Sequence, residues 1–422
     1  MLTEKNRICI TKMKSQNKAN VSKTSMIPDS HTKNKTLRDL AALISKHKFE
    51  IIQQNKIDLD NAGNLDPTLL DRLKVNEKKV DGMVASIEEV INLEDPVGRI
   101  LSQYKHPNGI YVENRTVPFG RILIIYESRP DVTIEAAINA FKAGNKIYLK
   151  GGKESKNTNI FLVRLWAKAL QINNLPLDFV TYLDIDREET QKLLKENYYQ
   201  LDLIIPRGGE TLINYIQQNT SVPLIISGRG NNFVYVHADA DFEMAQNIII
   251  NGKSRLSVCN AIDKVLFNKN TADLEQKIEL ILAAALKMNL DVYGDGDFFK
   301  SFNAIKPMES KLMYEEEFLS PKILFGIVET IDDAILSINK YSGKHSAVIV
   351  TDDELSATKF QNEVDCAAVY HNASSRFTDG GQFGLGAEIA ISTQKLHFRG
   401  PVGLAQLVTN KWFIAGNGQI RN

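Results

Sequence analysis

Two hydrophobic patterns near the N-terminus predict helices. Between residues 37 and 57 apolar side chains recur mostly every three or four positions, which places them on one face of one or two helices. A similar pattern at residues 69–91 follows Asp66 and Pro67, a suitable pair for an N-cap and a first helical turn. We expect these helices to form a scaffold.

An alternating pattern replaces the helical spacing at residues 109–118. The side chains alternate there as they do in a β-strand, and the sequence Pro-Asn-Gly at 107–109 is a turn signal. The pattern therefore predicts a β-hairpin arm. We expect the apolar stretch at 404–414 to fold back on this arm. An exposed arm needs a cover, such as another subunit.

From Gly120 onward, short apolar runs alternate with amphipathic runs. We predict strands at 121–126, 146–150, 179–183 and 201–205, with helices at 133–143, 158–171 and 188–195. A second series begins near Ala261, with strands at 322–328, 347–351 and 367–371 and helices at 272–287, 331–339 and 354–364. Repeated β-α-β units of this size predict an α/β fold with parallel sheets and right-handed crossovers.

Polar turns follow three of these strands, at 127–131, 150–154 and 206–210. Ligands of parallel sheets bind beyond the carboxyl ends of the strands. Two of the turns contain Gly-Gly pairs, which let backbone N–H groups approach an anion closely, and Lys150, Lys153 and Arg207 add positive charge. Each Gly-Gly turn alone also fits an ordinary β-α connection. Two such turns in one sheet favour a nucleotide-binding site.

Cys259 lies between an amphipathic run at 242–251 and an apolar run at 264–268. One interpretation is a buried small hydrophobe, which is where most free cysteines are found. The other is a reactive thiolate, because the basic pair Lys253 and Arg255 makes the setting electropositive. Local sequence leaves both interpretations open. A position between two α/β segments is a favoured place for a substrate cleft.

Composition narrows the class of protein. The 422 residues exceed what one hydrophobic core usually supports, and 43% apolar with 24% charged residues is ordinary for a globular protein. Lys plus Arg and Asp plus Glu both total 51, which gives no electrostatic reason to expect a nucleic-acid or membrane partner. Three cysteines fit a reducing cytoplasm. The polar residues 1–35 lack the apolar centre of a secretory signal, and we expect most of them to form a loosely docked tail.

Several sequence blocks are longer than a chance motif. They are DPVG at 95–98, YESRP at 126–130, GGKE at 151–154, IPRGG at 205–209, SVCNA at 257–261 and NASSRFTDGG at 372–381. In these blocks the chain resembles the gamma-glutamyl phosphate reductase family of the aldehyde dehydrogenase superfamily. The longest block runs from 383 to 397, and the resemblance extends from about Lys33 to the C-terminus. It implies an aldehyde dehydrogenase-like fold, with two Rossmann-type parallel-sheet α/β domains and a small β oligomerisation arm.

The resemblance also implies a reaction. The thiolate of Cys259 would attack the acyl carbon of L-glutamyl 5-phosphate, phosphate would leave, and NADPH would reduce the thioester to L-glutamate 5-semialdehyde, the second step of proline biosynthesis from glutamate. The backbone N–H of Cys259 and the side chain of Asn260 are candidate oxyanion donors. Relatives that hydrolyse their thioester use a glutamate base. The turn at 227–230, roughly where that base would lie, has no carboxylate.

Site residues follow from the resemblance position by position. It places Lys150 and Lys153 at the adenosine ribose, Gly208 and Gly209 near the pyrophosphate, and Glu317 at the nicotinamide ribose, and it counts Gly151 among the cofactor-binding residues. At the substrate it places Arg129, Arg255, Ser374, Ser375 and Arg376. A lysine at 153 would attract a 2′-phosphate, so we expect NADP(H) rather than NAD. Glu317 follows two other glutamates, which also fits a solvated face. We expect no metal.

The expected domains are a polar tail at 1–32, an NADP-binding domain at 33–103 and 117–256, and a catalytic domain at 257–372. Residues 104–116 and 395–422 would form the oligomerisation arm and C-terminal strand. The resemblance implies a cytoplasmic homo-oligomer, with a possible functional association with glutamate 5-kinase.

Three positions depart from the family pattern. Asp131 stands where many relatives have asparagine, Leu256 replaces a proline and Phe233 replaces a histidine. They leave two alternatives open. One is an acylating aldehyde dehydrogenase for a different acyl phosphate or thioester, and the other is a catalytically silent binding partner.

Overall fold

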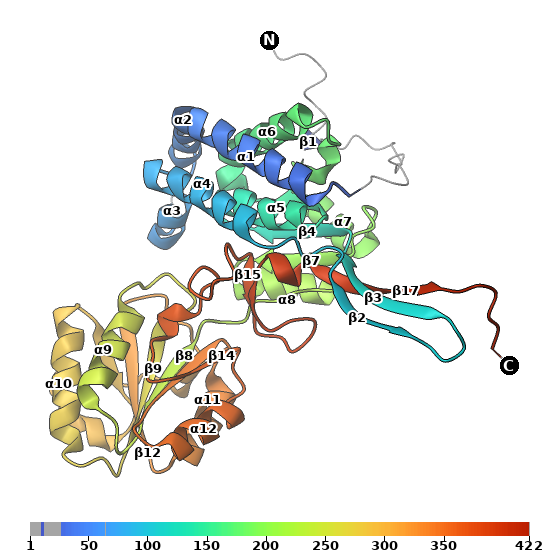
Figure 1. The fold of residues 1–422 in the computed structure, drawn as a ribbon. Coiled ribbons are helices and arrows are strands. Elements are labelled where there is room, and N and C mark those ends of the chain that lie inside the picture. Colours follow the sequence, from blue (N-terminus) through green and yellow to red (C-terminus); the bar gives the residue numbers. More distant parts are fainter. Residues whose placement is uncertain (1–9, 12–26, 64, 422) are drawn as a thin grey trace. The chain divides into compact units, whose positions relative to one another are not determined.

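The computed structural model describes residues 10–11, 27–63 and 65–421, which fall into two compact units (Figure 1). The first comprises Met1–Ile226, Gly384–Ala390 and Val402–Asn422, and the second Ser227–Phe383 and Ile391–Pro401. The first unit therefore ends before the predicted domain boundary at 256. The physical reason is that strand β8 (Asn232–Val236) pairs with two strands of the second unit.

The two predicted N-terminal helical stretches each divide into two helices. They are α1 (Ser30–Lys46), α2 (Lys48–Asp60), α3 (Pro67–Leu73) and α4 (Glu77–Asn92). Helix α1 begins inside the segment expected to be loosely docked, because the Asp29 side chain caps it by accepting a hydrogen bond from Thr32 N–H at 2.8 Å. Lys33 is buried and pairs with Asp95 at 2.9 Å. Most of the predicted tail, residues 1–9 and 12–26, lies outside the described residues.

The first unit contains a parallel sheet in the order β1-β6-β5-β4-β7. The strands are β1 (Ile10–Thr11), β4 (Arg121–Tyr126), β5 (Lys146–Lys150), β6 (Val180–Leu183) and β7 (Leu203–Arg207), and the connecting helices are α5 (Val132–Lys142), α6 (Lys156–Ile172), α7 (Arg187–Glu196) and α8 (Glu210–Asn219). Leu123 and Ile125 pack in one apolar cluster with α7 and α8, and the alternate residues Ile122 and Ile124 are buried outside that cluster. The predicted strands and helices of this unit are confirmed.

The second unit contains a parallel sheet in the order β11-β10-β12-β9-β8-β13-β14. Besides β8 its strands are β9 (Ile262–Asn268), β10 (Asp291–Gly294), β11 (Lys306–Pro307), β12 (Lys322–Val328), β13 (Ser346–Val350) and β14 (Ala368–His371). Helices α9 (Phe242–Lys253) and α10 (Leu274–Lys287) cover one face, and α11 (Ile331–Tyr341) and α12 (Glu354–Glu363) cover the other. Both sheets together confirm the predicted α/β fold.

Short helices and strands complete both units. The 3-10 helices are η2 (Lys153–Ser155), η3 (Leu177–Phe179), η4 (Asp297–Ser301), η5 (Lys311–Tyr314), η6 (Ser375–Phe377) and η7 (Leu404–Gln406). Strands β15 (Ala390–Ser392) and β16 (Gly400–Val402) form a two-stranded sheet. No helix among the described residues is both long and apolar enough to cross a membrane.

The predicted hairpin arm is confirmed. Strands β2 (Ile100–Lys105) and β3 (Tyr111–Pro118) form an antiparallel hairpin, and β17 (Val408–Ala415) pairs along the whole of β3, as Figure 1 shows. Gly109 supports the turn with a φ of 93°, a conformation that glycine adopts without strain. Large apolar side chains on the arm are exposed, namely Ile100, Leu101, Tyr104, Trp412, Phe413 and Ile414.

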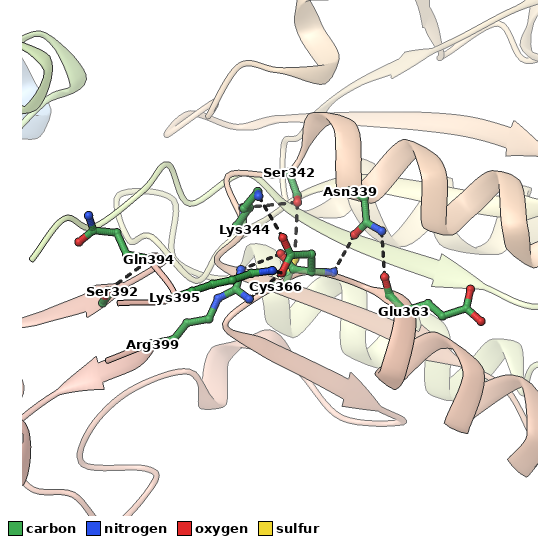
Figure 2. A network of polar contacts seen from close by, with 10 residues as sticks. Asn339, Ser342, Lys344, Glu363, Cys366, Ser392, Gln394, Lys395 and Arg399 are labelled. Atoms are coloured by element: carbon green, nitrogen blue, oxygen red, sulfur yellow. Dashed lines mark hydrogen bonds and ion pairs between the residues drawn. The ribbon is translucent and has the colours of Figure 1, made fainter. Parts of the chain in front are cut away.

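A charged network within the second unit holds residues 391–401 (Figure 2). The Asp365 carboxylate accepts hydrogen bonds from Lys344 at 3.0 Å and Arg399 at 2.7 Å, and Lys395 lies 3.4 Å from it. The hydrogen bonds from Arg399 and Lys344 hold the pKa of Asp365 well below its usual range. Asp365 is therefore an anionic anchor for the segment that includes β16.

Candidate active site

Cys259 lies in the turn between α9 and β9, and its side chain is half-buried. Its backbone is held closely. The Asn232 side chain donates a 2.7 Å hydrogen bond to the Cys259 carbonyl, and a Cβ atom placed on Gly230 would lie 2.1 Å from the same oxygen. The turn at 227–230 therefore contacts the cysteine backbone, and it presents no carboxylate there.

Asn260 connects the cysteine turn to the loop around η6. Its amide donates to the carbonyls of Arg376 at 3.2 Å and Thr378 at 3.0 Å, and its side-chain oxygen accepts a bond from the Arg376 guanidinium. The Ser375 hydroxyl donates to the Asn260 carbonyl at 2.7 Å. Both amide protons expected to serve an oxyanion are therefore engaged in holding a loop.

One cationic side chain interacts with the thiol of Cys259, and a second lies near the first. Burial, followed by repulsion from Arg255, lowers the pKa of Arg376, whereas Cys259 and Asp379 oppose this shift. The guanidinium of Arg376 is thus close enough to Cys259 for their charges to interact, with Arg255 nearby. Cationic neighbours favour a thiolate over a thiol. Of the basic pair expected from sequence, Lys253 is instead buried in an ion pair with Asp263, and the cation shown to interact with the thiol is Arg376.

The neighbouring serines Ser374 and Ser375 make different contacts. Ser375 is fully buried, and the Ser374 hydroxyl donates a 2.7 Å hydrogen bond to the Asn251 side chain on α9. A shallow recess opens beside Ser374. It is lined by Asp241, Glu243, Met244, Asn247, Ile248, Asn251, Ser374 and Phe377.

In the first unit, the three predicted turns meet at one sheet edge. Strand β4 lies between β5 and β7, and all three run parallel. The Glu154 carboxylate accepts bonds of 2.8 Å from both the N–H and the hydroxyl of Ser128, and Gly209 N–H donates to Glu127 at 3.1 Å. The juxtaposition expected from the strand pattern is confirmed.

Among the glycines of these turns, Gly151 and Gly208 lie where a side chain would meet neighbouring atoms, whereas a Cβ on Gly209 would meet nothing within 4 Å. A Cβ on Gly151 would be 2.3 Å from the Asn159 amide nitrogen, and one on Gly208 would be 2.6 Å from a Glu127 oxygen. Lys150 donates to the Gly151 carbonyl at 2.9 Å, and its pKa is lowered by burial. Close backbone and cationic side chains fit an anionic nucleotide. However, the Glu127 carboxylate already accepts from Gly209, which was expected near a pyrophosphate.

The remaining cofactor and substrate candidates have contrasting surroundings. Lys153 is exposed at the start of η2, and Arg129 is half-buried after the left-handed residue Ser128 (φ 41°). Glu317 is half-buried after η5. The first unit therefore brings together Lys150, Gly151, Lys153, Gly208, Gly209 and Arg129, and the second brings together Cys259, Asn260, Arg255, Ser374, Ser375 and Arg376.

The residues that depart from the family pattern are also placed. Asp131 precedes α5, and its Oδ1 is buried without a hydrogen-bond partner among the described residues. Burial is the largest cause that raises the pKa of Glu135, and the negative charge of Asp131 raises this pKa further. Phe233 is fully buried on β8 and Leu256 is half-buried against the core, so both have packing roles.

Sequence reasoning missed residues that build the site through long-range contacts. Asn232 and Gly230 support the cysteine backbone, Asn251 holds Ser374, and the Glu127 and Glu154 carboxylates join the turns of the first sheet. The double asparagine at 231–232 beside a Gly-x-Gly turn was the one local signal, since buried amides usually bond to backbone.

The family model for the aldehyde dehydrogenase family matches residues 16–292. The chain belongs to the aldehyde dehydrogenase family.

Two relatives narrow the assignment within that family. The chain is 45% identical to the gamma-glutamyl phosphate reductase of Dictyoglomus thermophilum, over 93% of this chain and 95% of that protein. A crystal structure of gamma-glutamyl phosphate reductase from Thermotoga maritima has 38% identity and a TM-score of 0.88, and covers 94% and 95% of the two chains. The chain is thus a member of the gamma-glutamyl phosphate reductase branch, as its sequence blocks predicted.

A more distant structure shares the fold alone. An engineered glycolyl-CoA reductase with bound NADP⁺ is 17% identical with a TM-score of 0.65, over 92% of each chain. The aldehyde dehydrogenase-like architecture predicted from sequence is confirmed by these likenesses.

Proposed function

We propose that the protein reduces L-glutamyl 5-phosphate to L-glutamate 5-semialdehyde and phosphate, using NADPH and a cysteine thioester. The observation that supports this most is the setting of Cys259. It lies half-buried in a turn whose backbone accepts a hydrogen bond from Asn232, its charge interacts with that of Arg376, and the chain belongs with gamma-glutamyl phosphate reductases. The reaction is the second step of proline biosynthesis from glutamate.

Cys259 is the proposed nucleophile. Its thiolate attacks the acyl carbon, a C–S bond forms, the C–O bond to phosphate breaks, and phosphate leaves with that electron pair. NADPH, when bound, supplies the hydride that reduces the thioester. The turn at 227–230, which contacts the Cys259 backbone, has no carboxylate to activate water. This composition suits a thioester that is reduced rather than hydrolysed.

We assign the oxyanion contact to the backbone N–H of Cys259 alone. For Asn260 we propose a role other than the oxyanion donor that was expected from sequence. Both amide protons of Asn260 are bonded to carbonyls of residues 376 and 378, and its oxygen accepts from Arg376. In this proposal Asn260 orients Arg376 beside the thiolate. Arg376 then faces the anionic groups of the substrate, for which a planar guanidinium is well suited.

The substrate's amino-acid end is proposed to lie at the recess beside Ser374. Asp241 and Glu243 line it and would attract an α-ammonium group, and Asn247 and Asn251 supply neutral hydrogen-bonding groups. Arg255 and Arg129 remain the proposed phosphate partners. Ser375 is fully buried and bonded to Asn260, so its proposed contribution is to hold the loop.

The cofactor proposal is NADP(H) rather than NAD. Lys150 and Lys153 lie at the glycine turn after β5, where their charge would attract a 2′-phosphate. Gly151 and Gly208 permit the close backbone approach that a dinucleotide needs. Glu317 is proposed to contact the nicotinamide ribose. Binding near Gly209 requires the Glu127 carboxylate to turn away, because it would repel a pyrophosphate.

We further propose a cytoplasmic homo-oligomer that associates through the β2-β3-β17 arm. The exposed apolar side chains of the arm support this proposal, because soluble monomers rarely expose a contiguous apolar face. A functional association with glutamate 5-kinase is proposed because glutamyl phosphate is short-lived and must reach Cys259 intact.

The first test uses the reverse reaction: phosphate-dependent reduction of NADP by L-glutamate 5-semialdehyde. We expect the wild type to be active and Cys259→Ala to lose at least about a thousandfold in rate, as expected on removal of a nucleophile. Cys366→Ala is the matched control. Burial raises the pKa of Cys366 to about 11, so this thiol is unreactive and its loss should leave the rate unchanged.

Two other results would change the proposal. A wild type that binds NADPH but does not oxidise glutamate 5-semialdehyde would favour an acylating aldehyde dehydrogenase for another acyl phosphate or thioester, which the unusual Asp131 permits. A Cys259→Ala variant with wild-type activity would contradict the thioester mechanism.

A further inference from the structure

The segment that includes Glu317 is held by side chains from outside it. The Tyr314 carbonyl accepts from Asn231 at 2.6 Å, the Glu315 carbonyl from Arg229 at 2.9 Å, the Glu316 carbonyl from Lys264 at 2.7 Å, and Phe318 N–H donates to Asp263 at 2.8 Å. The segment thus has a fixed backbone although only its first residue belongs to a helix. Such dense fixing of an irregular segment is characteristic of functional loops.

The Asp263 contact is part of a buried charge cluster. Lys253 lies 2.6 Å from Asp263, and their side chains are 0% and 2% exposed. Lys264 is also fully buried, with its ammonium 3.7 Å from the centre of the Phe318 ring. Buried ion pairs give little net stability, because desolvation opposes the attraction between the charges. A gain in folding stability therefore does not explain why these three charged side chains are buried together.

The cluster connects two parts of the proposed site. Lys253 ends α9 and Asp263 lies in β9, so their ion pair closes the turn that contains Cys259. One Asp263 oxygen accepts from Lys253, and the other accepts from Phe318 N–H. A single carboxylate thus joins both ends of the Cys259 turn to the segment that includes Glu317.

Backbone conformation adds a second sign of constraint. Leu319, directly after Phe318, has a φ of 45°. Bulky residues rarely adopt this left-handed conformation, which persists only where the surroundings enforce it. The contacts to Phe318 and Glu316 supply that enforcement.

We propose that Lys253, Asp263 and Lys264 are positioning residues that fix Glu317 relative to the Cys259 turn. This inference rests on the proposed function, in which Cys259 bonds to the acyl carbon and Glu317 contacts the nicotinamide ribose. A displacement of about 1 Å between two reacting partners costs roughly a hundredfold in rate, so a shared anchor has a direct catalytic use.

The test uses substitutions that keep the volume of the buried side chains. In the double variant Lys253→Met/Asp263→Leu, apolar residues replace the ion pair, which is commonly tolerated in a core, whereas Phe318 N–H loses its acceptor. Lys264→Met keeps the packing against Phe318 but removes the bond to the Glu316 carbonyl. Lys306→Met is the matched control, because Lys306 is an exposed lysine of the same sheet that pairs with Asp291 at 2.6 Å.

Three measurements are compared with the wild type. In the cofactor-free protein, we expect amide hydrogen exchange in the peptide at 314–319 to be at least about tenfold faster in the double variant. In Lys264→Met we expect the KM for NADP to rise about tenfold, while the KM for phosphate and the alkylation rate of Cys259 by iodoacetamide stay within about twofold. Lys306→Met should match the wild type throughout.

A folded double variant with wild-type exchange at 314–319, or a Lys264→Met variant with an unchanged KM for NADP, would overturn the proposal. If the double variant does not fold, the KM of Lys264→Met for NADP still tests the proposal. If the wild type does not oxidise glutamate 5-semialdehyde, the proposed function fails, whereas the exchange measurement in cofactor-free protein still tests the anchoring contacts.

Discussion

Cys259 and Cys366 show how surroundings determine the chemistry of one side-chain type. Cys366 is buried beside Ser342, and burial raises its thiol pKa to about 11. Cys259 is half-buried, and its charge interacts with that of Arg376, which in turn interacts with Arg255. A cationic neighbour favours the thiolate form of a cysteine. The sequence alone left Cys259 open between these two environments. The role of Cys259 as a nucleophile stays a proposal, which the Cys259→Ala variant tests.

Lys264 has an unusual acid–base setting as well. Burial lowers its pKa from an ordinary value of 10.5 to about 7. Between these two pH values the unfolded chain binds a proton at this site that the native protein has largely released. The free energy of unfolding therefore rises with pH through this window, as far as Lys264 contributes.

The Lys264→Met variant tests this contribution. It removes the ammonium that is costly to bury at neutral pH, so we expect its melting temperature to exceed that of the wild type at pH 7. The difference should shrink as the pH rises to 9.5, where wild-type Lys264 is neutral. Calorimetry at both pH values measures it, with Lys306→Met as the control. A difference that does not change with pH would contradict a lowered pKa.

At the scale of elements, hydrophobic periodicity predicted most of the fold. The strands 121–126, 146–150 and 322–328 have the same bounds in the structure. Strands β8 and β10 were missed. Strand β8 begins at Asn232, a polar residue whose side chain bonds to backbone carbonyls of the cysteine turn, and β10 has only four residues.

The candidate site residues could be named from sequence where they cluster in sequence blocks. Contacts between distant blocks were not. Asn260 bonds to Arg376 and Thr378 over a separation of more than a hundred residues, and no local pattern reports which partner takes an amide proton. For the same reason the pairing of Lys253 with Asp263, and its link to Phe318, required the folded chain.

The network of Figure 2 makes a prediction about residues 391–401. Asp365→Asn removes the ion pairs with Lys344 and Arg399, each of which contributes up to about 1 kcal/mol. We expect local opening of this segment to become roughly tenfold more frequent. Tryptic cleavage after Lys395, followed by mass spectrometry, measures this opening. Asp297→Asn, at an exposed pair with Lys300, is the control, and equal cleavage in both variants would refute an anchoring role.

At the scale of the whole molecule, the β2-β3-β17 arm of the first unit exposes large apolar side chains among the described residues. Strand β2 is exposed at every residue, and Trp412 and Ile414 project from one face of β17 at 49% and 60% exposure. Edge strands with apolar side chains pair readily with other chains. A second copy of this chain is the proposed occupant.

The double variant Trp412→Glu/Ile414→Glu tests this association. Charges on the apolar face should oppose burial, so sedimentation velocity is expected to show an oligomer for the wild type and a monomer for the variant. Leu355→Glu, at an exposed apolar residue on α12, is the control and should leave the sedimentation unchanged. A monomeric wild type would exclude the proposed assembly.

The path of the chain between its two units has a consequence for biosynthesis. The chain passes from one unit to the other at 226–227, 383–384, 390–391 and 401–402. Strand β17, which pairs with β3, is synthesised about 290 residues after β3. At ribosomal speeds of roughly 5–20 residues per second, one edge of β3 waits on the order of 15–60 s for that partner. During this interval one edge of β3 stays unpaired, and unpaired strand edges are where a nascent chain is most exposed to pairing with other chains.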